Sequence, residues 1–182
     1  MTATLIGVLV VGPYATFVEY PKVLSSVRPD GNPVNASLPG AAARIFGGEE
    51  QAHSVVSLPW AVPAVVVLGW FLVLLTTWAV RKDESGLGLW AVAAASLLAS
   101  PIAWHNYLVV LSSGILVLVG RGHTYTAVLL LTLVLIPPQW TDMWEEAPNV
   151  SDLLAALALS FYTFILVAHW LAFLTAAARF SR

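Results

Sequence analysis

The chain alternates between long uncharged runs and short segments that carry its charges. The runs without a formal charge cover 58–80, 86–120, 122–141 and 153–178. A helix of about 20 apolar residues crosses the roughly 30 Å hydrocarbon core of a bilayer, so the runs 58–80 and 153–178 each predict one membrane-spanning helix. Pro59 and Pro63 lie near the start of the first of these helices, where a missing backbone N–H costs little.

The run 86–120 requires a choice between one helix and two. A single helix over this run would be about 52 Å long, which is too long for one crossing. Ser100-Pro101 lies near the middle of the run. Proline removes a backbone donor and disfavours helical geometry in the residue before it. The sequence therefore predicts helices at about 86–99 and about 103–120, joined by a turn at Ser100–His105.

The distribution of charge favours two passes through this run. With two passes, one side of the membrane receives the basic residues Arg81, Lys82, Arg121, Arg179 and Arg182. The other side receives the acidic residues Glu19, Asp30, Glu49, Glu50, Asp142, Glu145, Glu146 and Asp152. A single pass would move Arg179 and Arg182 to the acidic side. Basic residues concentrate on the cytoplasmic side of membrane proteins, so the loops 18–57 and 138–152 and the turn at 100–105 are expected outside. The outer loop 18–57 also holds Lys22, Arg28 and Arg44, but it is long enough that its charges need not set the orientation.

Residues 3–18 form a further apolar segment, which Pro13 interrupts. This segment lacks the positive n-region and the clear cleavage site of a signal peptide, and apolar sequence starts almost at Met1, as expected of a truncated or split protein. The predicted spans are then about 3–18, 58–80, 86–99, 103–120, 124–138 and 153–178. The prediction is an all-α, polytopic integral membrane protein with one membrane domain over 1–182 and both termini in the cytoplasm.

Composition supports the membrane class and excludes several others. The chain is 59% hydrophobic and only 10% charged, whereas a soluble domain carries about 25% charged residues. The net charge of −2 provides no basic field for nucleic acid. The absence of cysteine excludes a disulfide framework, a thiolate zinc site and a cysteine nucleophile. Histidines and carboxylates do not occur at metal-ligand spacing, so no metal or cofactor is expected.

The predicted outer loop contains a short helix with its own start and stop signals. Ser37 is placed as an N-cap, Pro39 lies in the first turn, and Gly47-Gly48 ends the helix, which predicts a helix at about 38–46. We expect this helix to lie on the membrane surface, with its apolar side formed by Leu38, Ala42, Ile45 and Phe46. One interpretation is an amphipathic linker helix. The other is that Asn35, Ser37 and Arg44 contact a polar or phosphorylated head group, because the donors of arginine form a fork that suits phosphate.

A second polar segment, 100–107, includes the predicted turn at Ser100–His105. It carries Trp104, His105, Asn106 and Tyr107 at membrane depth or at the outer interface. Tryptophan and tyrosine there are typical of an aromatic belt. Histidine and asparagine are costly inside a membrane and often mark a functional site, so both an interfacial and a functional role remain open for this segment.

Two other groups of residues favour structural interpretations. His169, in the last predicted span, is expected to make an interhelical hydrogen bond or to lie at the interface. The acidic residues Asp142, Glu145 and Glu146 share a predicted outer loop with Trp140 and Trp144. A solvated loop with interfacial tryptophan anchors is favoured there over a cation site.

The two polar segments together resemble the C-terminal half of glycosyltransferase family 87, which includes polyprenyl-phosphate-mannose-dependent α-mannosyltransferases. The first matching stretch has the pattern Asn-x-Ser-Leu-x-Gly-x-x-x-Arg, formed by Asn35, Ser37, Leu38, Gly40 and Arg44. The second has a Ser-Pro-x-x-Trp pattern followed by aromatic residues, formed by Ser100, Pro101, Trp104 and Tyr107. The family often has a histidine two residues after the tryptophan. This chain has Asn106 there, and His105 is displaced by one position. The resemblance covers about residues 14–120.

This resemblance implies a GT-C-type fold and an enzyme of the bacterial cytoplasmic membrane. The implied donor is a polyprenyl-phosphate-linked sugar, mannose or a related hexose or pentose, and the implied acceptor is a lipid or cell-envelope glycan on the outer face, in contact with membrane lipids. Arg44 would stabilise the leaving phosphate, and Asn35, Ser37, Trp104, His105, Asn106 and Tyr107 would line the donor or acceptor cavity. The expected catalytic acid belongs to a missing N-terminal half, so the catalytic residues are unassigned and the isolated chain is expected to be inactive.

The rival hypothesis is a non-catalytic membrane protein, either a small permease or an assembly subunit. A permease typically contains inverted repeats whose helices break near the midplane of the membrane. The sequence shows one such break, at Ser100-Pro101, without a counterpart. We therefore rank the permease second.

Overall fold

The computed structural model describes residues 29–47, 54–58, 60–137, 139–145 and 152–180. Over these residues the chain is helical and contains no β-strand apart from an isolated bridge between Asn35 and Trp104. The elements are α3 (Leu38–Phe46), α4 (Ala61–Ala79), α5 (Leu87–Ala99), the 3-10 helix η2 (His105–Leu111), α6 (Ser112–Gly120), α7 (Thr124–Val134), α8 (Gln139–Glu145), α9 (Asp152–Leu159) and α10 (Phe161–Phe180). The all-α class is confirmed.

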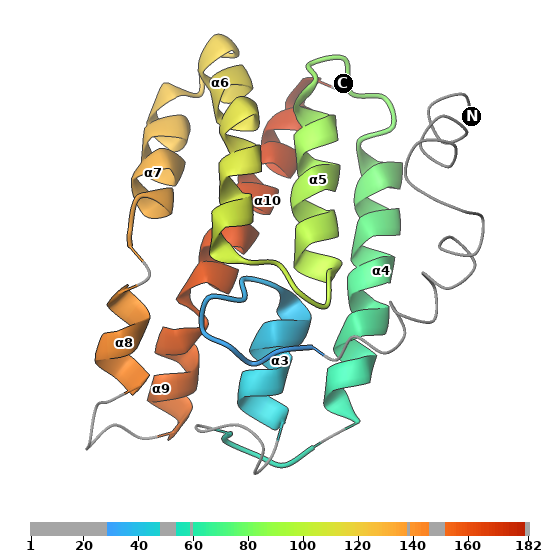
Figure 1. Ribbon diagram of the computed structural model, residues 1–182. Coiled ribbons are helices and arrows are strands. Elements are labelled where there is room, and N and C mark those ends of the chain that lie inside the picture. Colours follow the sequence, from blue (N-terminus) through green and yellow to red (C-terminus); the bar gives the residue numbers. More distant parts are fainter. Residues whose placement is uncertain (1–28, 48–53, 59, 138, 146–151, 181–182) are drawn as a thin grey trace, which may run out of the picture.

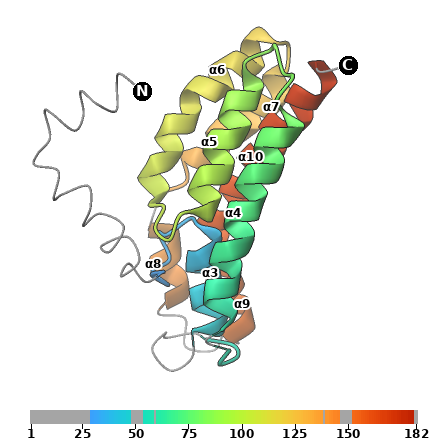
Figure 2. The same ribbon diagram turned by 90° about the vertical axis from the view of Figure 1, so that its right-hand side faces the viewer.

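The helices form an elongated bundle with two different ends. Helices α4, α5, α6, α7 and α10 run along its length, and α3, α8 and α9 lie together at one end, which we call the α3 end (Figures 1 and 2). The α4–α5 loop, the α6–α7 turn and the last turn of α10 lie at the opposite end, which we call the loop end (Figure 1). The predicted outer and cytoplasmic segments that the structure describes thus separate to opposite ends of the molecule.

Small residues allow close packing around α5, which contacts both α4 and α10. Ala91, Ala94 and Ala95 of α5 are buried. A Cβ atom added at Gly69 of α4 would lie 2.9 Å from the backbone Cα atom of Ala99. Such close approach of backbones at small residues is a common way for helices to associate inside membranes, where hydrophobic driving force between helices is weak.

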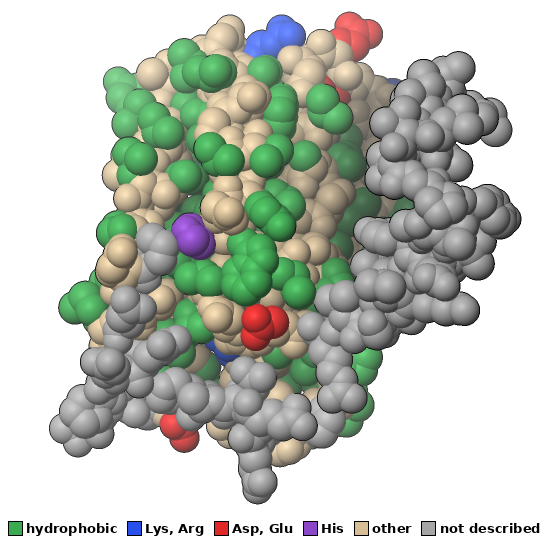
Figure 3. Space-filling model, in the orientation of Figure 1, with side chains coloured by type: hydrophobic (Ala, Val, Ile, Leu, Met, Phe, Trp, Pro, Cys, Tyr) green, Lys and Arg blue, Asp and Glu red, His purple; other side chains and the backbone are tan. Residues whose placement is uncertain are grey.

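The outer surface of α4 is strongly apolar. Seven of its large hydrophobic side chains are between 54% and 65% exposed: Val67, Leu68, Trp70, Phe71, Leu74, Leu75 and Trp78. Hydrophobic side chains also cover much of the face shown in Figure 3, where visible charged groups lie toward the upper end and in the lower third. An apolar surface of this extent is typical of a membrane or a protein interface rather than of a solvated monomer.

Two helices are long and apolar enough to cross a membrane, Ala61–Ala79 and Phe161–Arg179. Three further apolar helices are shorter, at Leu87–Ala99, His105–Gly120 and Thr124–Val134. The structure therefore contains two helices that meet the requirements of a span, and the six predicted crossings stay a prediction. The first predicted span, 3–18, lies outside the described residues.

Several boundaries follow the sequence signals closely. Helix α3 covers the predicted 38–46, and the Ser37 side chain caps it by accepting a hydrogen bond from the backbone N–H of Gly40. The apolar run 86–120 is divided at Ser100-Pro101, with α5 ending at Ala99. These features depend on capping and proline sterics, which act within a few residues.

Other boundaries differ from the prediction. The run 153–178 is not one helix, because α9 ends at Leu159 and α10 begins at Phe161. The Ser160 hydroxyl between them donates to the carbonyl of Ala156 at 2.7 Å, and such side-chain bonds often bend helices. Helix α7 ends at Val134, short of the predicted 138, and α8 forms inside the predicted loop 138–152.

The environment of α3 also corrects the prediction of a membrane-surface helix. Helix α3 packs against α4, α5 and α9. Its buried residues include Gly40, Ala43 and Arg44 as well as the predicted apolar residue Ala42. Burial on more than one side makes α3 an internal element of the α3 end rather than an amphipathic helix lying free on a bilayer.

Candidate functional site

The two polar segments recognised in the sequence lie in contact at the α3 end. The backbone N–H of Ala36 donates to the carbonyl of Ala103 at 2.7 Å, and that of His105 donates to the carbonyl of Val34 at 2.8 Å. These bonds surround the antiparallel bridge between Asn35 and Trp104. The fold thus joins two segments that lie more than 60 residues apart in the chain.

The Asn35 side chain holds this junction together. It is fully buried. Its amide nitrogen Nδ2 donates to the carbonyls of Asp30 at 2.7 Å and Pro101 at 3.2 Å. Its oxygen Oδ1 accepts from the backbone N–H groups of Ala103 at 2.9 Å and Ser37 at 3.2 Å. An asparagine side chain has two donors and an oxygen with two lone pairs, so internal contacts use its full capacity.

Gly40 is required by the position of this amide. A Cβ atom at Gly40 would lie 2.5 Å from Asn35 Nδ2 and 2.6 Å from Asn35 Cγ. Neither neighbour can move easily, because four hydrogen bonds hold the asparagine. The first turn of α3 therefore approaches Asn35 too closely for any side chain at position 40.

Arg44 is buried below the junction, with 4% of its surface exposed. Its Nη1 donates to the carbonyls of Asn32 at 2.7 Å and Asn35 at 3.2 Å, and its Nη2 donates to the carbonyl of Asn35 at 3.2 Å. Its Nε donates to Ser160 Oγ at 3.2 Å, and Nη2 also donates to Thr163 Oγ1 at 3.1 Å. Five bonds match the five N–H donors of a guanidinium group.

These contacts correct the expected position of Arg44. The sequence placed it on a surface helix with its donors directed at a phosphorylated head group, whereas the structure places it inside with its donors in use. Burial lowers the pKa of Arg44 to about 10, although the charge of Asp30 opposes this shift. The group is therefore charged at neutral pH, and it links the junction to the α9–α10 bend. Sequence reasoning missed its partners Ser160 and Thr163, which were signalled only by being polar within an apolar run.

The remaining residues of the second segment lie nearer the surface. Asn106 and Tyr107 are exposed, and Trp104 and His105 are half-buried. The His105 ring lies 5.4 Å from the Tyr162 ring, centroid to centroid. The sequence did not identify Tyr162 as part of the site, because α10 comes beside η2 only through the tertiary fold.

A row of aromatic rings extends from this point to α8. Ring centroids are 5.9 Å apart for Tyr162 and Phe161, 5.6 Å for Phe161 and Trp140, and 5.7 Å for Trp140 and Trp144. We call these four residues together with His105 the aromatic row. Spacings of this kind are favourable for aromatic pairs, which prefer centroid distances of about 4.5–7 Å.

Three nitrogen atoms in the aromatic row are buried and have no hydrogen-bond partner among the described residues. They are Nδ1 of His105, Nε1 of Trp140 and Nε1 of Trp144. Buried polar atoms are normally paired, and exceptions require an explanation such as a bound water or a functional contact. The sequence predicts both tryptophans to be interfacial anchors. Their rings and unpaired N–H groups make them candidates for a ligand contact.

His169 lies elsewhere, in the interior of the bundle. It is fully buried, and its Nδ1 lies 2.8 Å from the carbonyl of Ile165 in its own helix. The interhelical hydrogen bond predicted for His169 is made instead by its neighbour Trp170, whose Nε1 donates to Thr76 Oγ1 of α4 at 3.1 Å. Helix rotation, which the sequence did not define, decides which of the two residues faces α4.

Among the residues that the structure describes, no group of three or more histidine or acidic side chains is placed to hold a metal ion. The side chains of Asp142, Glu145 and Glu146 lie outside the description.

No protein-family model, curated protein or solved structure matches the chain. The resemblance to glycosyltransferase family 87 therefore rests on the residues named above.

Proposed function

We propose that this chain is the C-terminal, membrane-embedded part of a glycosyltransferase that uses a polyprenyl-phosphate-linked sugar. The sugar would be mannose or a related hexose or pentose, and the acceptor a lipid or cell-envelope glycan on the outer face. The observation that carries the proposal is the junction of the two family-like segments beside the aromatic row, where three buried nitrogen atoms have no hydrogen-bond partner among the described residues.

The chemistry of the aromatic row suits a sugar better than it suits a lipid tail. A sugar ring presents C–H groups that pack on aromatic faces and hydroxyl groups that need hydrogen-bond partners. Ligand sites commonly combine apolar and aromatic walls with a few placed polar groups. The row supplies both, through the half-buried ring of Phe161 and the nitrogens of Trp140, Trp144 and His105. Tyr162 is 1% exposed and supports the row from inside the bundle.

In this proposal the junction is a scaffold and the aromatic row is the contact surface. Asn35, Ser37 and Arg44 hold the two segments in register, while Trp104, Asn106 and Tyr107 lie close enough to the surface to meet the lipid carrier or acceptor. During transfer a base removes the acceptor hydroxyl proton, the oxygen bonds to the anomeric carbon, and the bond to the lipid phosphate breaks. We assign the base to the N-terminal half that the resemblance implies.

Trp140→Phe separates a binding role of the indole nitrogen from a structural one. The change keeps an aromatic ring and removes an N–H group that has no partner in the described structure. Removing an unpaired buried N–H offsets part of the burial that the smaller ring loses, so we expect the free energy of unfolding to fall by no more than about 1 kcal/mol. Binding of polyprenyl-phosphate mannose should weaken about tenfold, as expected for loss of one hydrogen bond.

The matched control is Trp170→Phe, which removes an indole N–H that is paired with Thr76 Oγ1. This variant should lose about 1 kcal/mol of stability and keep donor binding. Both variants are measured in the same lipid nanodiscs by titration with the donor and by denaturant unfolding. Equal donor affinity in Trp140→Phe and the parent, or no donor binding by the parent, would contradict the proposed site.

The predicted orientation is tested by single cysteines, since the chain contains none. Met143 of α8 is 71% exposed, and Glu84 in the α4–α5 loop is also exposed. In intact cells an impermeant maleimide should label Met143→Cys, and it should label Glu84→Cys only after the membrane is permeabilised. Labelling of Glu84→Cys in intact cells would reverse the orientation and place the aromatic row on the cytoplasmic side.

A further inference from the structure

A small cleft lies at the loop end, far from the aromatic row, between α6, α7 and α10. Its volume is about 80 Å³. A water molecule needs about 10–15 Å³ of such space, so the cleft has room for a group of several heavy atoms. Its polar lining residues are His123, Thr126, Thr175 and Arg179, and its other lining residues are leucine and alanine.

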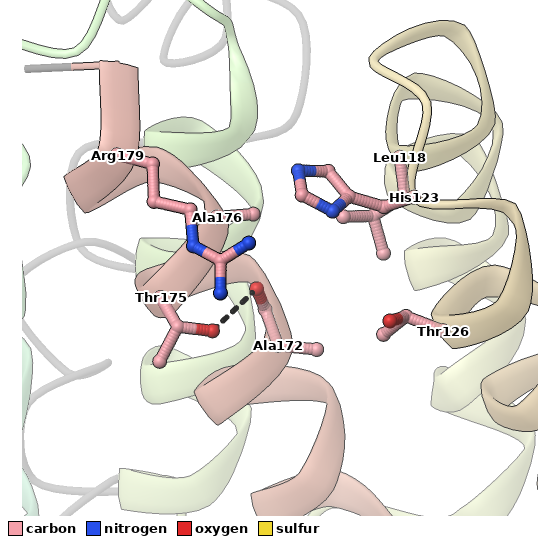
Figure 4. Close-up of a pocket in the computed structure, with 7 residues that line it drawn as sticks. All are labelled: Leu118, His123, Thr126, Ala172, Thr175, Ala176 and Arg179. Carbon is pink, nitrogen blue, oxygen red and sulfur yellow. Dashed lines mark hydrogen bonds between the residues drawn. The ribbon is translucent and has the colours of Figure 1, made fainter.

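The polar side chains converge from both sides of the cleft. Arg179 extends its guanidinium group from α10, and the His123 imidazole and the Thr126 hydroxyl face it from the α6–α7 turn and α7 (Figure 4). Thr175 donates its hydroxyl hydrogen within α10, which leaves oxygen lone pairs but no donor for a ligand. The charge of the cleft is therefore set by Arg179.

The electrostatics favour an anion. None of the residues that line the cleft is acidic. Helix α7 begins at Thr124, beside His123, so the positive end of its dipole lies next to the cleft and adds to the field of Arg179. A guanidinium group with a planar fork of donors matches the oxygen atoms of a phosphate group.

The surroundings of the cleft match a lipid. The helices α6 and α7, which border the cleft, also carry exposed apolar side chains: Leu116, Val119, Tyr125, Val128 and Leu129. Acyl chains could cover this surface while the head group enters the cleft. The loop end also carries Arg81, Lys82 and Arg121 and is the end predicted to face the cytoplasm, where membrane leaflets are rich in anionic lipids.

We propose that the cleft between α6, α7 and α10 binds a phosphate group through Arg179, and that an anionic phospholipid supplies it. The site is separate from the aromatic row, and it would hold the loop end against one leaflet whether or not the chain takes part in sugar transfer. The ligand of this cleft is a phosphate group with at least one negative charge. Both a phospholipid head group and free inorganic phosphate contain such a group.

The test measures binding of short-chain phosphatidylglycerol, short-chain phosphatidylcholine and inorganic phosphate to the full chain in a neutral detergent. Arg179→Gln should weaken phosphatidylglycerol binding about tenfold or more, and Arg179→Lys should lie between this variant and the parent because lysine keeps the charge without the fork. Phosphatidylcholine, which has no net charge, should bind weakly to all of them.

Lys82→Gln is the matched control, since it removes one positive charge from an exposed site at the same end but outside the cleft. It should change phosphatidylglycerol affinity by less than about twofold. Thr126→Val tests the opposite wall of the cleft without altering charge and should weaken binding about threefold. Thermal unfolding of each variant shows whether a loss of binding arises from misfolding, and Thr126→Val decides the result if Arg179→Gln does not fold.

Equal losses for Arg179→Gln and Lys82→Gln would overturn the proposal, because the attraction would then come from the charge of the whole end. The proposal would also be overturned if neither Thr126→Val nor Arg179→Gln lowered the affinity for phosphatidylglycerol. Inorganic phosphate that binds as tightly as phosphatidylglycerol, in an Arg179-dependent way, would keep the phosphate site and overturn the lipid as its source.

Discussion

Replacing Arg44 with alanine is expected to lower the free energy of unfolding by about 3–5 kcal/mol. Hydrogen bonds to a charged group are worth about 1.5–3 kcal/mol each, and the desolvation cost of the buried guanidinium group offsets part of their sum. The change removes five hydrogen bonds and leaves the carbonyl of Asn35 without the donors it now has. The Asn32 carbonyl keeps the backbone N–H of Asn35, and the hydroxyls of Ser160 and Thr163 keep the bonds that they donate. Unpaired buried polar groups cost about 1–3 kcal/mol each. The junction and the α9–α10 bend would also lose the side chain that connects them.

Arg44→Lys should lose roughly half as much stability, because an ammonium group keeps the charge but has only three donors. Lys82→Ala, at an exposed position, should stay within about 0.5 kcal/mol of the parent. The measurement is denaturant unfolding in mixed micelles, followed by tryptophan fluorescence. If Arg44→Ala unfolds at the same denaturant concentration as Lys82→Ala, the buried contacts of Arg44 do not stabilise the fold.

The same series distinguishes the two roles considered for this arginine. A phosphate-binding Arg44 would lose donor affinity in Arg44→Ala at unchanged stability. A clamp between Asn35, Ser160 and Thr163 loses stability first, and donor affinity follows only as the α3 end loosens. Donor binding measured below the unfolding transition, beside the unfolding curve, therefore separates the two roles.

The Asn35–Gly40 contact should produce the second large effect and a strong non-additivity. Gly40→Ala is expected to cost about 1–3 kcal/mol, because the new Cβ atom would overlap the Asn35 amide. Asn35→Ala should cost about 3 kcal/mol, since it leaves two backbone carbonyls and two backbone N–H groups at the junction without their partner. In the double variant the overlap is absent, so adding Gly40→Ala to Asn35→Ala should cost less than about 1 kcal/mol.

Gly120→Ala is the control for glycine replacement in a helix. Gly120 ends α6, and an added Cβ atom would meet no other atom within 4 Å. We expect this variant to be neutral or up to about 1 kcal/mol more stable than the parent, in line with the helix propensity of alanine. Additive losses for Asn35→Ala and Gly40→Ala would contradict the close contact and would indicate that each residue acts through a different neighbour.

These expectations give the family-like stretch 35–44 a physical meaning in this chain. Asn35 joins two segments, Ser37 caps α3, Gly40 makes room for the amide, and Arg44 ties the junction to α10. Each residue type is required by an internal contact. In the function proposed above, this stretch is the frame of the site, and the aromatic row beside it would supply the ligand contacts.

The sequence by itself determined the features that depend on neighbouring residues. Ser37 and Pro39 predicted the start of α3, Ser100-Pro101 predicted the division of the run 86–120, and the uncharged composition predicted apolar helices of spanning length. Capping, proline sterics and hydropathy act within one or two turns of helix, so a linear pattern is enough to detect them. The sequence placed both polar segments on the outer side of the membrane, but it did not predict that they contact each other.

The tertiary structure decided what those residues do. Arg44 appeared as a lone surface cation because its partners Ser160 and Thr163 lie 116 and 119 residues further along the chain. The aromatic row combines rings from η2, α8 and α10, and the packing of α10 against η2 brings Tyr162 beside His105. Burial, pairing and side-chain direction depend on how helices rotate and pack against each other. The hydropathy pattern of the long apolar helices α4, α5 and α10 is nearly uniform around each of them and leaves their rotation undetermined.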